Sequence, residues 1–592
     1  MAKNDRDSLW MPALAVVCGL AYRHDGLPYL SSALAALQEG KLAYMCTDFE
    51  LILSQTGRLE DGRYPGLRYE EQTFGKFHRF KDVAVPLRDG TTIYIDVYRP
   101  LDDTPSPSLV AWSPYGKHGL KNLGMMPGAD VPADWVSKHA IWEGPDPEYW
   151  CPRGYSIISP DPRGAWSSEG TLTFWSRFEA DDGYDLIEWL ARQPWSTGKI
   201  GMLGVSYLAV SQWMIAARRP PSLAAICPWE GFSDAYRELY FHGGIPEQGF
   251  LHWWQPMSRW SLNPAEDVVR MHELHPLRDG YWKSKAIDLS AIEVPAFVVA
   301  GWGDHGLHTR GTLEGYKQIS SKRKWLQVHG QKKWRHFYDP TSIAKQQAFF
   351  DHFLKGHDTA VSSWPAVTIE TRENNESITS RSEPSWPPPS ISPRRLFLDC
   401  GTMSLTKDPP LDLTQATYES TAQDGRVSFG HCFSEDTEIT GGAALHIWMS
   451  AEAHVEMDVF IAFRKLDREG KEVGFRFFST FSDGPVALGW LRASHRALAA
   501  SSTLMQPVHA HDVTTPVQPG KAVALDIEIW PSSTLFRAGE SLQVMVGGTD
   551  LYVFKSGAPE NRHKTDNKGL HRILSGPGFE SYLTLPVKGQ PK

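Results

Sequence analysis

The sequence lacks the patterns that would point to a metal site, a disulfide framework or a membrane span. Its six cysteines are scattered over 592 residues without a C-x-x-C pair. This spacing excludes a zinc ribbon and a dense set of disulfides, so we expect buried free thiols, no metal and no cofactor. The apolar run from Pro12 to Tyr22 is too short to cross a bilayer, which takes about 20 apolar residues.

The N-terminus also lacks the features of a signal peptide. Asp5 and Asp7 stand where a cationic leader is expected, and no small-residue cleavage site follows the apolar run. We therefore expect an N-terminal helix of an intracellular, cytoplasmic protein without a membrane partner. Secretion is the alternative.

Positive charge is scarce as well. The chain has 60 Lys and Arg against 69 Asp and Glu, a formal net charge of -9, which argues against nucleic acid as a partner. A hydrophobic share of 41% and a charged share of 22% are typical of soluble globular proteins. The 23 tryptophans are many for this length, and such side chains fill cores or line apolar ligand pockets.

The stretch from Lys199 to Ala209 lacks the second glycine of a G-x-S-x-G motif, because Leu208 stands in its place. The rest of the stretch still predicts a nucleophile at Ser206. A short apolar strand leads into the turn Gly204-Val205-Ser206, and residues 207–218 predict a helix. A serine on such a turn is strained and exposed, and it lies near helix-terminal N–H groups that can bind an oxyanion. The alternative is a serine that caps an ordinary helix.

Strands and helices alternate on both sides of this serine. Amphipathic or closing helices are predicted at 178–193 and 344–354, and short apolar runs predict strands at 109–112, 155–158, 223–226, 294–301 and 325–328. This alternation implies a parallel sheet with both faces covered. An aromatic, helix-leaning insertion at 229–290 interrupts it. The insertion is expected to cap the serine, and it can also be a subdomain with its own core.

A nucleophilic serine needs a base, and the base needs an orienting carboxylate. Asp304 directly follows the strand at 294–301, and His336 lies in the loop after the next strand. The order Ser206, Asp304, His336 fits a hydrolytic triad in which each member follows a sheet strand. Asp304 can instead cap a helix near residue 307, and three further histidines compete for the role of the base: His305, His308 and His329.

Several fragments together resemble one family, the cocaine esterase and Xaa-Pro dipeptidyl peptidase group of α/β-hydrolases, which includes α-amino-acid ester hydrolases. The resemblance covers roughly residue 77 to the end. The matching fragments are Val85–Gly90, Asp96–Pro100, Asp161–Gly164 with Ser168–Gly170, Glu179–Asp185, Gly201–Tyr207, Gly301-Trp302, Trp530-Pro531 and Phe536–Gly539.

The resemblance implies an architecture and a set of site residues. It implies an α/β-hydrolase core (77–228 and 291–360) with a helical cap (229–290), and a C-terminal β-sandwich or jelly roll (361–592). The short alternating strands after the proline-rich stretch 385–389 predict the same all-β end. A mostly helical extension (1–76) precedes the core and falls outside the resemblance.

The family's catalytic residues carry over to Ser206, Asp304 and His336. Lys332-Lys333 replaces the Gly-Pro that often precedes the family's Trp-x-His. The oxyanion hole carries over to the Tyr115 hydroxyl and the backbone N–H of Tyr207.

The expected function is therefore a serine hydrolase that cleaves an ester of a bulky hydrophobic small molecule through an acyl-enzyme. An acyltransferase or cyclase with the same acyl-enzyme is one alternative, and a non-catalytic binding protein is the least favoured. An X-Pro dipeptidyl peptidase is another alternative function. Such an enzyme needs a carboxylate that binds the free amino terminus of its substrate. Candidates for that carboxylate are Glu230, Asp234, Glu238 and Glu247. The partner is expected to be a small acyl substrate, and homo-oligomerisation stays open.

Overall fold

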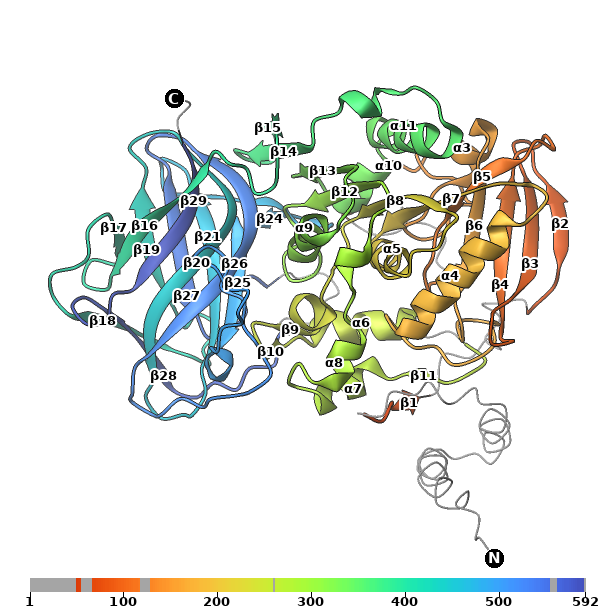
Figure 1. Cartoon of the computed structure of the whole chain (residues 1–592). Coiled ribbons are helices and arrows are strands. Elements are labelled where there is room, and N and C mark those ends of the chain that lie inside the picture. The colour runs from red at the N-terminus through yellow and green to blue at the C-terminus, as the bar shows by residue number, and fades with distance from the viewer. Residues whose placement is uncertain (1–48, 55–65, 118–127, 259–260, 554–561, 590–592) are drawn as a thin grey trace, which may run out of the picture. The chain divides into compact units, whose positions relative to one another are not determined.

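The computed structural model describes residues 49–54, 66–117, 128–258, 261–553 and 562–589 (Figure 1). The chain divides into a small unit, residues 1–50 with 88–90, and a large unit that contains residues 51–87 and 91–592. Most of the predicted helical extension (1–48 and 55–65) lies outside the described residues. Its described part contains strands rather than helices: β1 (Leu53–Ser54) and β2 (Glu70–Thr73).

A central sheet forms the first half of the large unit. Its strand order is β2-β3-β4-β6-β5-β7-β8-β12-β13-β14-β15, and pairing is parallel from β6 through β14. This order is consistent with the predicted hydrolase core. The strands are β3 (His78–Pro86), β4 (Thr92–Arg99), β5 (Ser106–Val110), β6 (Ser156–Asp161), β7 (Ser196–Val205), β8 (Leu223–Trp229), β12 (Ala296–Gly301), β13 (Lys324–His329), β14 (Val367–Arg372) and β15 (Ile378–Glu383).

Helices cover both faces of this sheet, as its apolar strands require. Every residue of β5, β6 and β12 is buried, which is typical of parallel strands with two covered faces. In Figure 1, α3, α10 and α11 lie on one side of the strands, and α4, α5 and α9 lie on the other. These helices are α3 (Pro147–Trp150), α4 (Arg177–Ala191), α5 (Tyr207–Ala217), α9 (Thr309–Gln318), α10 (Lys333–Tyr338) and α11 (Pro340–Lys355).

The sheet extends beyond the expected boundaries at 77 and 360. At one end, β2 pairs with β3. At the other end, β14 lies parallel to β13, and β15 closes the edge antiparallel to β14. The boundary at residue 361, which came with the family resemblance, placed β14 and β15 in the all-β part, although their backbone pairs with the α/β sheet.

The insertion at 229–290 combines short helices with three two-residue strands, and it has an aromatic core of its own. Tyr236 stacks on Phe241 at 4.6 Å, and Tyr240 lies 4.5 Å from Trp282. Its elements are a π-helix (Tyr236–Tyr240), β9 (Phe241–His242), β10 (Ile245–Pro246), α6 (Gly249–Ser258), β11 (Ala265–Glu266), α7 (Val268–Leu274), α8 (Gly280–Ser284) and a 3-10 turn (Leu289–Ala291).

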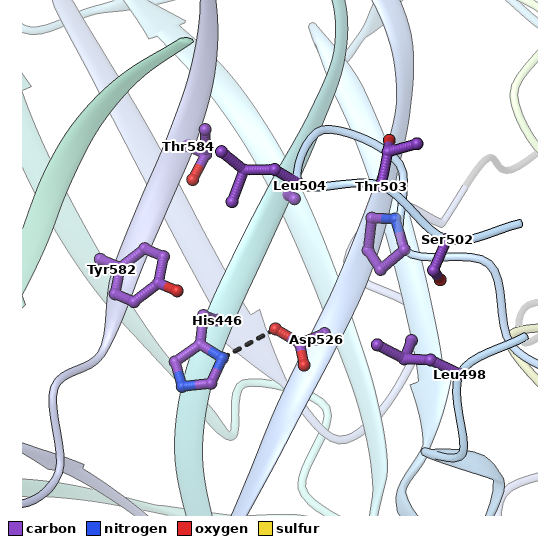
Figure 2. A pocket seen from close by; sticks show the side chains of 10 residues that line it. His446, Leu498, Ser502, Thr503, Leu504, Asp526, Tyr582 and Thr584 are labelled. Carbon is purple, nitrogen blue, oxygen red and sulfur yellow. Dashed lines mark hydrogen bonds and ion pairs between the residues drawn. The ribbon is translucent and has the colours of Figure 1, made fainter. Parts of the chain in front are cut away.

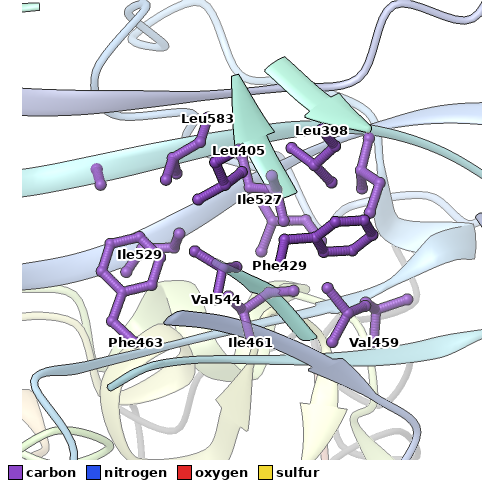
Figure 3. Close-up of a cluster of buried hydrophobic side chains, with 14 of the residues drawn as sticks. Leu398, Leu405, Phe429, Val459, Ile461, Phe463, Ile527, Ile529, Val544 and Leu583 are labelled. Carbon is purple, nitrogen blue, oxygen red and sulfur yellow. The ribbon is translucent and has the colours of Figure 1, made fainter. Parts of the chain in front are cut away.

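The C-terminal part is mostly β, as predicted. One set of strands pairs in the order β16-β29-β20-β26, with β28 and β18 continuing from β20, and a second pairs as β19-β27-β21-β25. Alternating Leu, Ile, Val and Phe side chains of both sets meet in a buried core (Figure 3).

The strands of this part vary widely in length. They are β16 (Ile391–Asp399), β17 (Ser404–Thr406), β18 (Thr414–Glu419), β19 (Arg426–Cys432), β20 (Thr437–Ala451), β21 (Asp458–Leu466), β22 (Glu472–Val473), β23 (Phe475–Phe477), β24 (Phe481–Gly484), β25 (Ala487–Arg492), β26 (Val523–Phe536), β27 (Ser541–Gly547), β28 (Leu570–Ser575) and β29 (Tyr582–Lys588). Short 3-10 turns occupy Cys151–Arg153, Ala360–Ser363 and Ala493–His495.

The described cysteines are free thiols. Cys151, Cys227 and Cys400 are buried, in agreement with the prediction, whereas Cys432 is exposed at the end of β19. None of the helices in the described ranges is long and apolar enough to cross a membrane.

Candidate active site

Ser206 occupies the turn between β7 and α5. Its backbone has φ 61° and ψ −117°, a conformation that is strained for a residue with a Cβ atom. Its N–H donates to the carbonyls of Trp229, the last residue of the neighbouring strand β8, at 3.0 Å and of Glu230 at 3.1 Å. The sequence therefore folds here as the motif predicts, with the serine side chain presented at the C-terminal edge of the parallel strands.

Leu208 in place of the second glycine is compatible with this turn. Gly204 has φ 153°, and a Cβ atom at this position would lie 2.4 Å from the Cβ of Leu208. The first glycine of the motif is therefore required, because the leucine side chain packs directly against it.

His308 joins Ser206 to Asp304. The Ser206 Oγ lies 3.3 Å from His308 Nε2, and His308 Nδ1 lies 2.5 Å from Asp304 Oδ2. The carboxylate can only accept, so Nδ1 carries the proton and Nε2 faces the serine as an acceptor. Asp304 follows β12 directly, and its carbonyl accepts the N–H groups of His308 and Thr309 at the start of α9.

His336, the histidine predicted as the base, lies elsewhere. It belongs to α10, its Nε2 accepts a hydrogen bond from the Gln327 side-chain amide at 2.8 Å, and its ring lies 4.0 Å from that of His329. Burial, His329 and Lys345 lower its pKa well below the usual value. The prediction that His336 pairs with Ser206 and Asp304 is therefore corrected to His308, because α10 turns His336 toward β13.

The other two competing histidines have partners of their own. His305 donates from Nε2 to the Pro531 carbonyl at 3.1 Å, and its Nδ1 accepts the N–H of Leu488. His329 Nε2 lies 3.0 Å from the Glu230 carboxylate. Of the four candidates, His308 alone contacts the Ser206 side chain among the described residues.

Lys333 shares the Asp304 carboxylate with His308. Its Nζ lies 3.0 Å from Asp304 Oδ2 and 3.3 Å from His308 Nδ1, and all three side chains are buried. Burial alone would raise the pKa of Asp304, but Lys333 and His308 hold it well below its usual value. Burial and the Lys333 charge lower the pKa of His308, against the opposing effect of Asp304. The imidazole is therefore neutral at neutral pH.

A second buried carboxylate, Glu143, lies near this group. Its backbone has φ 61°, its Oε1 accepts from Trp334 Nε1 at 2.8 Å, and its Oε2 has no hydrogen-bond partner among the residues that the structure describes. Burial raises the pKa of Glu143 to about 7, although Lys333 and Trp334 favour the charged form. The Glu143 carbonyl accepts the N–H of Val205, so this residue is tied to the turn that carries the serine.

The two residues predicted for the oxyanion hole lie on either side of Ser206. The Tyr115 hydroxyl lies close to the Ser206 side chain, and burial together with Glu143 raises its pKa well above the usual value, so it remains a donor. Tyr207 is the first residue of α5, where backbone N–H groups have no partner within the helix. The Tyr207 hydroxyl donates to Glu179 at 2.8 Å, which anchors its ring away from the serine.

Three further side chains support this group, and the sequence analysis assigned none of them to the site. Glu179 accepts from Trp112 Nε1 at 2.8 Å and from the Trp175 N–H at 2.9 Å. Trp254 of α6 donates from Nε1 to the Tyr115 hydroxyl at 3.1 Å. Lys333 is the third, and its only sequence signal was the departure from Gly-Pro before Trp334.

A separate pocket of about 270 Å³ lies on the C-terminal part (Figure 2). His446 Nδ1 lies 2.7 Å from Asp526, and its ring stacks on Tyr582 at 4.9 Å. The Ser502 hydroxyl in its wall donates to the Val508 carbonyl, so this histidine–aspartate pair lacks a bonded serine. The pocket is lined by Ala444, His446, Leu498, Ser502, Thr503, Leu504, Pro507, Asp526, Tyr582 and Thr584.

A serine on a strand-to-helix turn, with a histidine and a buried aspartate behind it and donors beside it, defines the class: the protein is a serine hydrolase with a mostly β C-terminal domain. The profile of the X-Pro dipeptidyl-peptidase (S15 family) matches residues 89–263, and that of the X-Pro dipeptidyl-peptidase C-terminal non-catalytic domain matches residues 359–584. The chain belongs to the CocE/NonD family of hydrolases.

The family assignment depends on a solved structure, a CocE/NonD family hydrolase from Staphylococcus aureus. It is 38% identical, with a TM-score of 0.83, over 87% of this chain and 94% of that chain. The cocaine esterase of Rhodococcus sp. (strain MB1 Bresler) is 24% identical over 87% of this chain and 99% of its own length. An α-amino acid ester hydrolase shares the fold at 17% identity, with a TM-score of 0.64 over 86% and 97% of the two chains.

Proposed function

We propose that this hydrolase cleaves an ester of a bulky hydrophobic small molecule through an acyl-enzyme on Ser206. The observation that carries the proposal is the continuous contact from Ser206 Oγ to His308 Nε2 and from His308 Nδ1 to Asp304. A nucleophile, its base and the carboxylate that orients the base are the parts that acyl transfer needs. No metal or cofactor takes part in this proposal.

The proposed reaction proceeds in two halves. His308 Nε2 takes the Ser206 proton as Oγ attacks the acyl carbon, and the resulting imidazolium is stabilised by Asp304. The Tyr115 hydroxyl and the Tyr207 N–H donate to the oxyanion, and the imidazolium then protonates the departing alcohol. Water, deprotonated by His308, attacks the acyl-enzyme and releases the acid.

We also propose the domain roles expected from the sequence: a catalytic core before and after 229–290, the insertion as a cap over the serine, and the C-terminal part as a jelly roll. The hydrogen bond from Trp254 of α6 to Tyr115 supports the cap role, because it brings the insertion to the proposed oxyanion hole.

An ester substrate is favoured over a peptide by the partners of the four carboxylates considered for amine binding. Each already has a partner within the chain: Glu230 with His329, Asp234 with Arg237, Glu238 with Arg310, and Glu247 with Arg562. A carboxylate that is already paired gains little by exchanging its partner for a substrate ammonium group.

An X-Pro dipeptidyl peptidase is the second candidate, and two observations favour it. The S15 profile matches residues 89–263, and Glu143 in that range has a buried carboxylate oxygen that no described residue pairs with. In this case Glu143 would pair with the free amino terminus of the substrate. Activity toward X-Pro p-nitroanilides, lost on Glu143→Gln while p-nitrophenyl esters are still cleaved, would favour this candidate.

The proposal is tested with p-nitrophenyl esters of increasing acyl size and with a fluorophosphonate probe. We expect Ser206→Ala to lower kcat by about 10⁶-fold and to abolish labelling, the size of loss seen when a triad serine is removed. Ser290→Ala is the matched control, because Ser290 is exposed and its hydroxyl donates to the nearby surface residue Asp288. Full turnover by folded Ser206→Ala would contradict the proposal. If the wild-type enzyme passed the acyl group to an added alcohol and formed a new ester, the result would instead indicate an acyltransferase.

A further inference from the structure

The Tyr115 hydroxyl has two neighbours that differ in chemistry. Trp254 Nε1 lies 3.1 Å away, and an indole N–H can only donate, so it occupies an acceptor position on the tyrosine oxygen. The Ser206 side chain also lies close to this hydroxyl. Since the tyrosine oxygen accepts from the indole, the one hydroxyl proton is left to donate to another group, and Ser206, where the oxyanion would form, lies beside it.

Trp254 is held firmly in this position. It is 2% exposed, and it stacks on Trp175 at 5.0 Å with 21° between the rings. Tyr207 lies nearly parallel to it at 6.2 Å, and Phe174 meets it edge-on at 5.0 Å. The ring stack fixes the direction of the N–H group, because the indole cannot rotate without losing these contacts.

We infer that Trp254 is a positioning residue that completes the oxyanion hole from the insertion. Its N–H orients and polarises the Tyr115 hydroxyl, so the donor is already aligned before charge develops on the substrate. This inference rests on the proposed function, and it adds that the oxyanion hole has full strength only while α6 is packed against the core.

The test separates the N–H group from the ring. Trp254→Phe keeps an aromatic ring in the stack and removes the donor, and we expect kcat to fall about tenfold with KM nearly unchanged, the size expected for one hydrogen bond. Tyr115→Phe is expected to lower kcat by about 10²–10³-fold. In the double variant the loss should equal that of Tyr115→Phe alone, because Trp254 acts only through the hydroxyl.

Trp253→Phe is the matched control. Trp253 is the preceding residue on the same helix and is 39% exposed, so its replacement should leave kcat and KM unchanged. Affinity for phenylboronic acid, which forms a tetrahedral adduct with a nucleophilic serine, should weaken in Trp254→Phe in parallel with kcat. Thermal unfolding of each variant shows whether the fold is kept.

Three results would overturn the inference. The first is a wild-type kcat in Trp254→Phe, and the second is a double variant whose loss in kcat is the product of the two single losses. The third is a rise in KM caused by Trp254→Phe that also occurs in the Tyr115→Phe background. The last would indicate a wall of the substrate pocket instead. A failure of the proposed function is recognised separately, because it would leave Ser206→Ala active.

Discussion

At the residue scale, the chemistry of the site depends on which histidine faces the serine. His308 contacts both Ser206 and Asp304, whereas His336 is bonded to Gln327. We predict that His308→Asn lowers kcat/KM for the best ester by at least about 10⁴-fold. The variant lacks the general base that accepts the serine proton and the general acid that protonates the leaving group. His336→Asn should stay within a few-fold of wild type.

The comparison is made on variants whose far-UV circular dichroism matches the wild type. His336→Asn is the matched control, since the same substitution is made at a second, partly buried histidine that does not contact Ser206. Loss of activity in folded His336→Asn, together with activity in His308→Asn, would restore His336 as the base.

Lys333 adds a charge to the site that a simple triad does not contain. Only neutral His308 can accept the serine proton, so kcat/KM should fall as pH drops through the pKa of His308. Because burial and Lys333 lower that pKa, the fall should occur below the ordinary histidine value of about 6.5. We predict that Lys333→Met moves the acidic limb upward, on the order of one pH unit.

The measurement is a pH profile of kcat/KM for both proteins on one ester. Lys332→Met serves as the control, since Lys332 is the neighbouring residue but pairs with Asp130 at 2.7 Å. An unmoved acidic limb in Lys333→Met would mean that Lys333 supports the fold of α10 and does not tune the base.

Ser206 and Asp304 were predictable because each follows an apolar strand directly, so the position of the side chain is set by the sheet. The choice of the base was not. His308 lies four residues after Asp304, and the distance between them depends on how the chain winds into α9, where the Asp304 carbonyl accepts two N–H groups. Trp334-x-His336 matched the family motif, but the side chain that reaches Asp304 is that of buried Lys333, which directly precedes Trp334.

At the element scale, hydrophobic periodicity predicted the parts of the fold that are buried on two faces. The helix predicted at 178–193 is α4, and the apolar run at 294–301 contains β12. Periodicity was less informative at β14 and β15, whose pattern suits either sheet. Which sheet they join depends on pairing with β13, a contact between distant residues that local sequence does not encode.

The same limit applies to the start of the sheet. Glu70–Thr73 is polar and half-exposed, so it has no apolar period, yet it pairs with β3 as an edge strand. Edge strands are often polar because one side faces water, so hydrophobic periodicity does not predict them.

At the scale of the whole molecule, α9 connects three parts of the chain through one buried residue. Arg310 Nη1 lies 2.6 Å from Glu238 of the insertion, and its Nε lies 3.0 Å from Glu528 of β26. His308, whose side chain contacts Ser206, is the N-cap residue of the same helix. The position of the proposed base is therefore tied to the insertion and to the C-terminal part.

We predict that Arg310→Met destabilises the whole protein, because it leaves the Glu238 carboxylate buried without its cation. Breaking a buried pair in this way costs about 3–5 kcal/mol, whereas exposed pairs contribute about 0–1 kcal/mol. Arg270→Met is the control, since Arg270 pairs with Glu273 on the surface with side chains 55% and 43% exposed. Urea unfolding followed by tryptophan fluorescence should show a clearly lower midpoint for Arg310→Met only. At urea concentrations below the unfolding transition, kcat of Arg310→Met should also be lower than that of the wild type, because His308 lies at the start of α9. Equal midpoints for the two variants would mean that the parts of the molecule are held together by packing and not by this residue.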